Sequence, residues 1–275
     1  MPTRSRLRSS TLALCIAAVL VPLSASADHS WGSYHWPRSS NPFSLTLGDN
    51  VSGAWDSYLQ TASNDWSISN VLDTSVVGGA TNRRRCRASN GRIEVCSSTY
   101  GQNGWLGVAS ISISGSHIRS ASVRVNDTYF NTPQYNTVAW RNLVMCQEVG
   151  HAFGLDHQDE NMTNPNLGSC MDYTNSPNSN QHPNPHDYEQ LELIYGHLDG
   201  GAQPSGASRN APPVMRQLDL AGPGQWGRIA SRYANGNPRT YVLDFGRGHR
   251  IVTHVFWAPD AAISSSGMPL EEADR

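Results

Sequence analysis

The sequence of 275 residues predicts an α+β fold, in which short strands occupy the first half of the chain and helices follow. Strands are indicated where apolar and polar residues alternate, as at 43–47, 106–113 and 117–125. Helices are indicated in the second half, where apolar residues recur three and four positions apart. Strands first and helices later favour one α+β domain over residues 28–198.

The first half of this domain should contain five strands and one helix. The helix is indicated by Trp55, Tyr58 and Leu59, which share a helical face. Gly115 marks a turn between the last two strands. The expected elements are strands at 43–47, 66–77, 92–96, 106–113 and 117–125, and a helix within 53–65.

Two longer helices are expected in the second half. The first begins at Asn136 or Thr137, either of which can cap it, and runs to about Phe153. A long loop rich in Asn, Asp and Ser follows. The second helix begins after Asn184, where proline takes the first helical position, and it ends at Gly196.

The two ends of the chain differ from this domain. Residues 1–27 are typical of a signal peptide, with a basic start, a short apolar run and a small-residue cleavage site. Residues 199–213 have the composition of a linker. Within residues 214–275, three alternating runs predict a β-rich appendage built as a three-stranded meander. We therefore expect a secreted chain with no membrane anchor after cleavage.

The charge of the chain limits its partners. Residues 1–27 contain three of the 20 basic residues and none of the 22 acidic ones, so the mature chain carries a formal charge of −5. A mildly acidic chain argues against nucleic acid or an anionic membrane as the main partner.

Four cysteines remain after residue 27, and an even number in an exported chain predicts two disulfides. Three pairings are open for Cys86, Cys96, Cys146 and Cys170. Proximity in the sequence favours Cys86 with Cys96, which leaves Cys146 for Cys170.

The segment 147–157 reads Q-E-V-G-H-A-F-G-L-D-H. Gln147, Glu148 and His151 share one helical face, and Gly154 can end the helix so that His157 returns beside His151. Two imidazoles and a third helical group could then bind one metal ion. Zinc in a catalytic site takes three protein ligands and keeps one position open, and a neighbouring carboxylate can take a proton from water.

This segment resembles the signature of the metzincin metalloproteases, H-E-x-x-H-x-x-G-x-x-H followed by a Met turn. The chain matches it at Glu148, His151, Gly154 and His157, and Met171 stands in the turn. The helix after Asn184 is similar to the last helix of matrixin-like catalytic domains. The resemblance implies a zincin domain with a twisted mixed sheet, an active-site helix, a Met turn and a C-terminal helix.

The resemblance also implies an activity, a secreted metalloendopeptidase with protein or peptide substrates. Glu148 would act as general base toward metal-activated water, and Gln147, His151 and His157 would bind one catalytic zinc ion. Met171 would lie beneath the metal. Tyr173 would bind the metal or stabilise the oxyanion, although it serves equally well as a core aromatic residue.

Two further expectations follow from the resemblance. An edge strand above the metal should pair with an extended substrate, and residues 106–113 are the candidate. A Met turn under the metal would bring Cys170 close to Cys146, which supports that disulfide. We expect a monomer.

The chain departs from the family pattern at Gln147, where the first ligand should be histidine. An amide oxygen is a harder and weaker zinc ligand than imidazole, so another divalent metal could serve. Calcium is left open, because Asp156, Asp159 and Glu160 lie nearby in a polar loop.

Two alternatives to an active protease remain. One is a catalytically inactive metzincin-fold binding module, and the other is a structural secreted protein held by disulfides. Other histidines could replace the missing ligand, but none has ligand spacing, and of these only His117 lies in a segment expected near the cleft. They are His117, His182, His186, His249 and His254.

Overall fold

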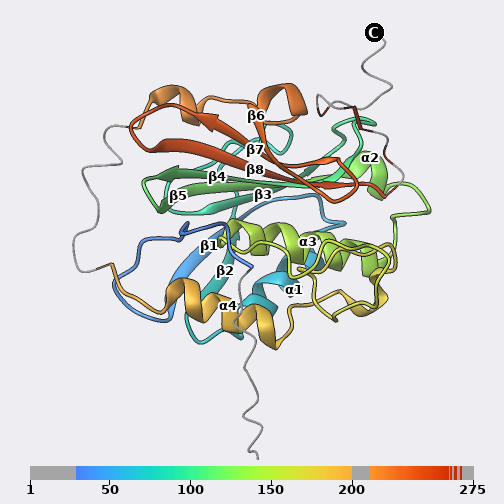
Figure 1. Ribbon diagram of the computed structural model, residues 1–275, viewed down its shortest axis with the longest axis horizontal. Coiled ribbons are helices and arrows are strands. Elements are labelled where there is room, and N and C mark those ends of the chain that lie inside the picture. Colours follow the sequence, from blue (N-terminus) through green and yellow to red (C-terminus); the bar gives the residue numbers. More distant parts are fainter. Residues whose placement is uncertain (1–28, 200–210, 260, 262, 265–266, 268–275) are drawn as a thin grey trace, which may run out of the picture.

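The computed structural model describes residues 29–199 and 211–259, together with 261, 263, 264 and 267 (Figure 1). The predicted signal peptide and most of the predicted linker lie outside the described residues. Within these residues, helices are too short or too polar to cross a membrane. The α+β fold class is confirmed: strands and helices pack as one mixed layer of sheet with helices against it.

The described residues form one eight-stranded sheet in the order β2-β1-β3-β5-β4-β8-β7-β6. Neighbours from β2 to β5 run parallel, and those from β5 to β6 run antiparallel. The strands are β1 (Phe43–Asn50), β2 (Leu72–Gly78), β3 (Ile93–Ser98), β4 (Trp105–Ser114), β5 (His117–Asn126), β6 (Arg228–Arg232), β7 (Pro238–Asp244) and β8 (His249–Trp257).

The three long helices lie on one side of the sheet, and the 3-10 turns η3 and η4 lie above the C-terminal strands (Figure 1). The elements are α1 (Asp56–Trp66), α2 (Asp127–Phe130), α3 (Val138–Ala152), α4 (Pro185–Tyr195), η1 (Pro177–Ser179), η3 (Pro213–Arg216) and η4 (Pro223–Gln225). Both expected helix starts are present. The Thr137 side chain accepts from the Trp140 N–H, and Asn184 and Asp187 form a capping box.

One expected boundary is wrong. Trp66 ends α1 instead of opening a strand, and β2 begins only at Leu72. The reason is tertiary, because the Trp66 side chain is fully buried beneath α3 and its indole N–H donates to the Cys146 carbonyl at 3.1 Å. That burial holds the residue on the helix.

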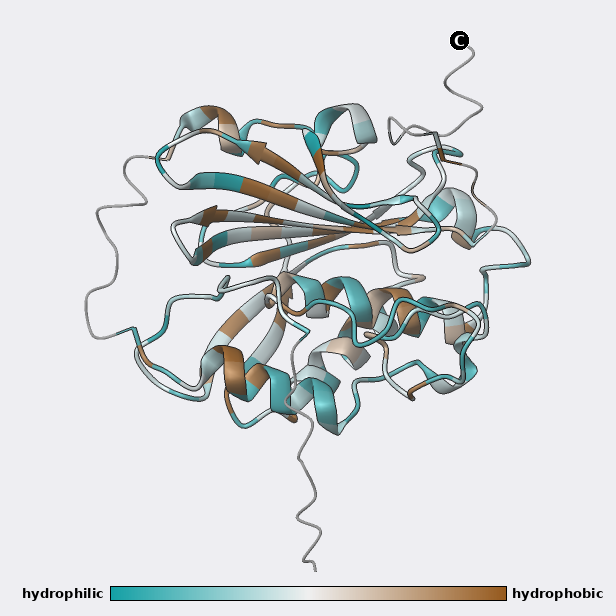
Figure 2. Cartoon of the chain, viewed as in Figure 1, coloured by the Kyte–Doolittle hydropathy of each residue, from teal (hydrophilic) through white to brown (hydrophobic). Residues whose placement is uncertain are grey.

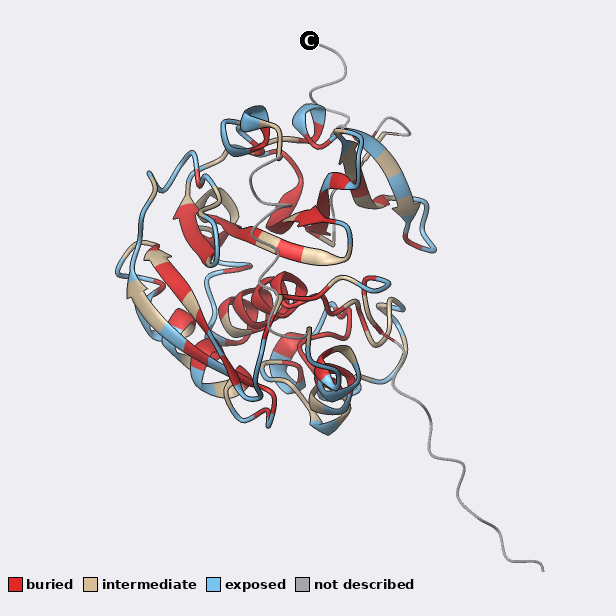
Figure 3. Ribbon diagram, turned by 90° about the vertical axis from the view of Figure 1, so that its left-hand side faces the viewer, coloured by how far each residue is buried: buried red, intermediate tan, exposed pale blue. Residues whose placement is uncertain are grey.

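Helix α3 forms the centre of the molecule, between the sheet, α1 and the loop around residue 170. Thirteen of its 15 residues are buried, and most of the helix is red in Figure 3. In Figure 2 the apolar residues concentrate on the central strands and the helix faces toward them. The polar residues Gln147, Glu148 and His151 therefore lie in the interior, where each needs a specific partner.

The predicted C-terminal meander is present as β6, β7 and β8, and it continues the same sheet. Strand β8 pairs antiparallel with β4 from one end to the other, with Ala109 opposite His254. The expectation that 106–113 forms a sheet edge is therefore wrong, since β4 lies between β5 and β8.

Both favoured disulfides are present. Cys86 and Cys96 have Cα atoms 5.9 Å apart, and Cys146 and Cys170 have Cα atoms 6.0 Å apart. The second bridge ties α3 to the turn that contains Met171, so it fixes the position of two predicted site segments relative to each other.

Candidate active site and metal centre

The chain reverses at the end of α3, as the glycine in the segment predicts. Gly154 has a φ of +98°, and a Cβ there would lie 2.4 Å from the Tyr34 carbonyl oxygen, so only glycine fits. The reversal brings His157 back to the helix. Its Nε2 atom lies 3.2 Å from Nε2 of His151.

A third histidine joins this pair from β8. The ring of His254 lies 3.9 Å from that of His151 and 4.7 Å from that of His157, measured between centroids. The potential ligand atoms of the three side chains all lie within 4.8 Å of one another. His254 had been set aside because it lacks ligand spacing. The alternation of residues 250–257 predicts a strand, but no local signal tells which strand lies beside it.

The hydrogen bonds around His151 and His254 leave one nitrogen of each ring with its lone pair, and that of His151 faces Nε2 of His157. His151 donates through Nδ1 to the Leu155 carbonyl at 2.9 Å, which leaves Nε2 with its lone pair. The Tyr233 hydroxyl donates to the Val255 carbonyl at 3.0 Å and accepts from Nε2 of His254 at 2.9 Å. His254 then presents Nδ1, which has no partner among the described residues. Such partners are typical of metal-binding histidines.

All three imidazoles are neutral at pH 7. Burial lowers the pKa of His151 far below its usual range, and the neighbouring His157 adds to this. Burial also lowers the pKa of His157 to about 4 and the pKa of His254 well below its usual value. Neutral imidazole is the form that binds metal ions.

Gln147 bridges α3 to the Met turn. Its side-chain Nε2 donates to the Cys170 carbonyl at 2.8 Å. The amide oxygen Oε1 is buried and has no hydrogen-bond partner among the described residues. A buried acceptor without a partner is costly, and a cation would satisfy it.

Glu148 follows on the same helix and is completely buried. Neither carboxylate oxygen has a hydrogen-bond partner among the described residues. The side chain packs against β4 at Gly107, where a Cβ would lie 2.6 Å from Oε1. Burial raises the pKa of this carboxyl well above its usual value. Such a group is destabilising unless chemistry or a nearby cation requires it.

Met171 packs directly against the active helix. A Cβ at Gly150 would lie 2.7 Å from the Met171 sulfur, so the glycine before His151 allows this close approach. Tyr173 is also buried, and its ring lies 4.9 Å from that of His157. The Tyr173 hydroxyl accepts from the backbone N–H of Trp257 at 3.2 Å. Burial is the main reason that the pKa of Tyr173 is raised.

The ring of Trp31, in the N-terminal segment, packs against the histidine cluster. It stacks on the ring of His151 at 5.2 Å with an interplanar angle of 6°. The backbone N–H of Trp31 donates to the Gly154 carbonyl at 2.8 Å, which anchors the segment to the chain reversal.

This donor set fits zinc. Potential ligand atoms of three neutral imidazoles lie within 4.8 Å of one another, and a buried amide oxygen and a buried carboxyl without hydrogen-bond partners lie on the same helix as His151. Nitrogen and oxygen donors of this kind are the usual zinc ligands, with a carboxylate beside them for proton transfer.

The nearby acidic residues are engaged elsewhere. Arg239 contacts Glu160 and lies 3.5 Å from a carboxylate oxygen of Asp156. Asp159 accepts hydrogen bonds from the Asn161 backbone and the Asn164 side chain. A calcium ion would have to compete with an arginine for two of these three carboxylates.

The remaining histidines lie outside the centre. His117 and His35 both reach Oδ1 of Asp199 at 3.2 Å, and Arg38 pairs with the other oxygen. His182 lies on the surface against Asp65. His249 lies at the far end of β8. His186 lies against the N-terminal segment.

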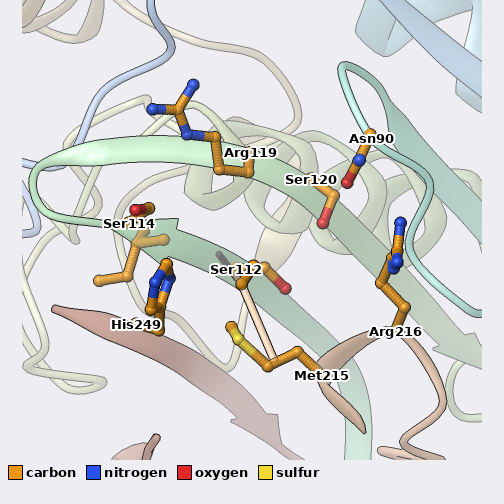
Figure 4. Close-up of a pocket in the computed structure, with 10 residues that line it drawn as sticks. Asn90, Ser112, Ser114, Arg119, Ser120, Met215, Arg216 and His249 are labelled. Carbon is orange, nitrogen blue, oxygen red and sulfur yellow. The ribbon is translucent and has the colours of Figure 1, made fainter. Parts of the chain in front are cut away.

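Two hollows flank the C-terminal region. Figure 4 shows a small one of about 30 Å³, with His249 and Met215 beside β4. A larger one of about 610 Å³ opens beside Tyr173 and Tyr233, next to the loop that contains Met162. The larger hollow reaches the rim of the histidine cluster through these two tyrosines.

No protein-family model and no curated protein match the sequence. Among solved structures, the chain is similar to myroilysin, at 15% identity and a TM-score of 0.37, over 62% of this chain and 99% of that one. It is also similar to high choriolytic enzyme 1, a hatching enzyme zinc-protease of the medaka fish Oryzias latipes. That match has 11% identity and a TM-score of 0.33, over 60% of this chain and 95% of the other.

Proposed function

We propose that the protein is a secreted metalloendopeptidase that hydrolyses internal bonds of protein or peptide substrates. The observation that carries this proposal is the buried, unpartnered Glu148 beside the neutral pair His151 and His157. A binding protein has no use for such a carboxyl, whereas a hydrolase requires it as a base.

One zinc ion would be held by Gln147, His151 and His157. When bound, it supplies the Lewis acidity that polarises the scissile carbonyl and activates water. Gln147 suits this role because its amide nitrogen is fixed by Cys170, which leaves the oxygen free. The amide oxygen is a weaker donor to zinc than imidazole, so the site also admits other divalent metals.

Glu148 would accept a proton from water on its carboxylate and deliver it to the nitrogen of the leaving amine. Burial alone raises the pKa of Glu148, and a bound cation nearby would favour the carboxylate form that has to accept the proton. The Tyr173 hydroxyl would donate to the oxyanion of the tetrahedral intermediate. Met171 would support the helix from below.

The setting of the proposed activity is extracellular. The described cysteines are paired in two disulfides, which persist in oxidising compartments. Together with the signal-peptide pattern of residues 1–27, they support export. We propose a monomer without nucleic-acid or membrane partners.

The test is Glu148→Gln in the full chain. The substitution keeps size and polarity but removes the proton acceptor, so zinc content should stay unchanged while peptide hydrolysis falls about a hundredfold or more. Glu192→Gln, on the exposed face of α4, is the matched control. Equal activity of Glu148→Gln and wild type would remove Glu148 from the mechanism.

A second candidate is a metal-binding module without catalysis, which the complete burial of His151 favours, since a substrate cannot reach a fully covered ligand. It differs from the protease in a measurable way. Such a module would bind zinc, but neither the wild type nor any variant would cleave casein or unstructured peptides.

A further inference from the structure

Strand β8 lies where an extended substrate would be expected. Peptides commonly bind proteases and other receptors by adding a strand to a free sheet edge. Without β8, the free edge would be β4, which carries Gly107 against Glu148. In the structure β8 fills that edge, antiparallel to β4 from Trp105 to Ser114.

The same strand covers the proposed catalytic groups. Its Trp257 N–H donates to the hydroxyl of Tyr173, and its Phe256 ring stacks on Tyr173 at 4.5 Å and 23°. Glu148 and His151 have no exposed surface. A substrate carbonyl therefore has no access to these groups while β8 is paired with β4.

His254 projects from this strand onto the proposed metal ligands. A catalytic zinc site has three protein ligands and one open position, whereas a closed site has four protein ligands. Under the proposed function Gln147, His151 and His157 would supply three donors, and His254 would add its unpartnered Nδ1, since the potential ligand atoms of the three histidines lie within 4.8 Å of one another. With His254 in place the site has the ligand count of a closed one.

We propose that β8 is an internal inhibitor: it occupies the substrate edge of β4, and His254 fills the open position of the metal. The chain in this conformation is latent, and it becomes active when β8 leaves β4. This inference rests on the proposed metalloendopeptidase function and specifies how that site is regulated.

The first test compares His254→Ala with His249→Ala in the zinc-loaded full chain. Both histidines are buried on β8, but His249 pairs opposite Ser114, at the other end of the strand. His254→Ala should retain about one zinc per chain and release it to a chelator at least about tenfold faster. Hydrolysis of an unstructured peptide should rise about tenfold, because more of the protein has an open site. His249→Ala should match wild type in both measurements.

The second test locks the strand in place. Oγ of Ser110 on β4 and Oγ1 of Thr253 on β8 lie 2.9 Å apart, so a cysteine pair at these positions can form a disulfide. Oxidised Ser110→Cys/Thr253→Cys should keep its zinc, release it no faster than wild type and lose residual hydrolysis about tenfold. The two single cysteine variants should behave like wild type.

The outcomes separate the inference from the function on which it rests. Loss of zinc and activity together in His254→Ala, with an active locked variant, would make His254 a permanent ligand and overturn latency. Faster zinc release from His254→Ala without hydrolysis by any variant would keep His254 as a cap but overturn the protease. His254→Leu, which keeps a buried side chain of comparable volume and offers no donor atom, gives the same readings if the alanine variant does not fold.

Discussion

At the scale of single residues, the proposed zinc affinity depends most on Gln147. Its amide nitrogen donates to the Cys170 carbonyl, so only the oxygen is free for a ligand role. Histidine at this position would offer a nitrogen donor of higher affinity for zinc. The hydrogen bond to Cys170 would be lost in exchange.

We predict that Gln147→His binds zinc about tenfold more tightly and hydrolyses peptide at least as well as wild type. Gln147→Ala should lose zinc affinity and activity together, because it removes both the donor and the contact to the Met turn. Zinc affinity is measured by chelator competition, and hydrolysis on the same preparations. Unchanged zinc affinity in Gln147→Ala would exclude this residue as a ligand.

Part of the site follows from local sequence. Glu148, His151 and Gly154 lie on one helix turn and its end, so their spacing alone places them together with His157. His254 follows from no such rule, because it lies 97 residues after His157 and reaches it only through strand pairing. The burial of Glu148 is equally non-local, since β4 packs against its side chain at Gly107.

At the scale of elements, the two disulfides join different parts of the fold. Cys146–Cys170 links α3 to the Met turn, and Cys86–Cys96 links a loop to β3. Only the first lies beside the proposed ligands, because the Cys170 carbonyl holds the Gln147 amide. Removing one disulfide or the other therefore offers a matched comparison, because each removal deletes one cross-link but only one of them lies beside the proposed ligands.

We predict that Cys146→Ala/Cys170→Ala loses about 3 kcal/mol of stability and also binds zinc more weakly. Cys86→Ala/Cys96→Ala should lose stability by a comparable amount but keep its zinc affinity. Urea unfolding and chelator competition on the two double variants supply the measurements. Equal zinc affinities would separate the Met turn from the metal centre.

Asp199 lies at the end of the first domain and forms an ion pair with Arg38 near its beginning. Burial alone would raise its pKa, but hydrogen bonds from the Arg38 N–H and from His117 and His35 lower it to about 2. Because the folded pKa lies below that of the unfolded chain, this carboxylate stabilises the fold above about pH 4. That contribution is lost as the pH falls from about 4 to 2.

We predict that Asp199→Asn is less stable than wild type at pH 7 and that the difference shrinks between about pH 4 and pH 2. Urea unfolding at several pH values in this range measures the difference. Asp244→Asn is the comparison for a surface carboxylate paired with an arginine. A difference independent of pH would mean that the charge of Asp199 contributes nothing.

Most elements could be predicted from their own residues, and the exceptions are informative. Alternation located β1, β3, β4 and β5, while caps located both long helices, since these signals are local. Trp66 was misplaced because its position depends on α3, 80 residues later in the chain. Helix α2 is only four residues long and is too short to show a period.

At the scale of the whole molecule, the sheet has two parts that meet between β4 and β8. Strands β2, β1, β3, β5 and β4 come from the first half of the chain, and β8, β7 and β6 come from its end. Pairing across this junction joins residues more than 130 positions apart, so no periodic pattern could reveal it.

We predict that loss of the His254 side chain loosens only β6, β7, β8 and the edge of β4 that pairs with β8. In His254→Ala, amide hydrogen exchange should rise in β6, β7 and β8 and at the β4 amides that bond to β8. Exchange in β1 and β3 should stay at the wild-type rate, because parallel neighbours hold both of their edges. Faster exchange over the entire sheet would indicate global unfolding and contradict this prediction.

The position of β8 also sets an order of events during synthesis. A ribosome completes β4 well over a hundred residues before it reaches β8, so every newborn chain carries the β4 edge without its partner for a time. Pairing over such a long sequence separation is slow compared with local folding. The strand that covers the histidines is therefore the last strand to be made, and a chain released before it would lack that cover altogether.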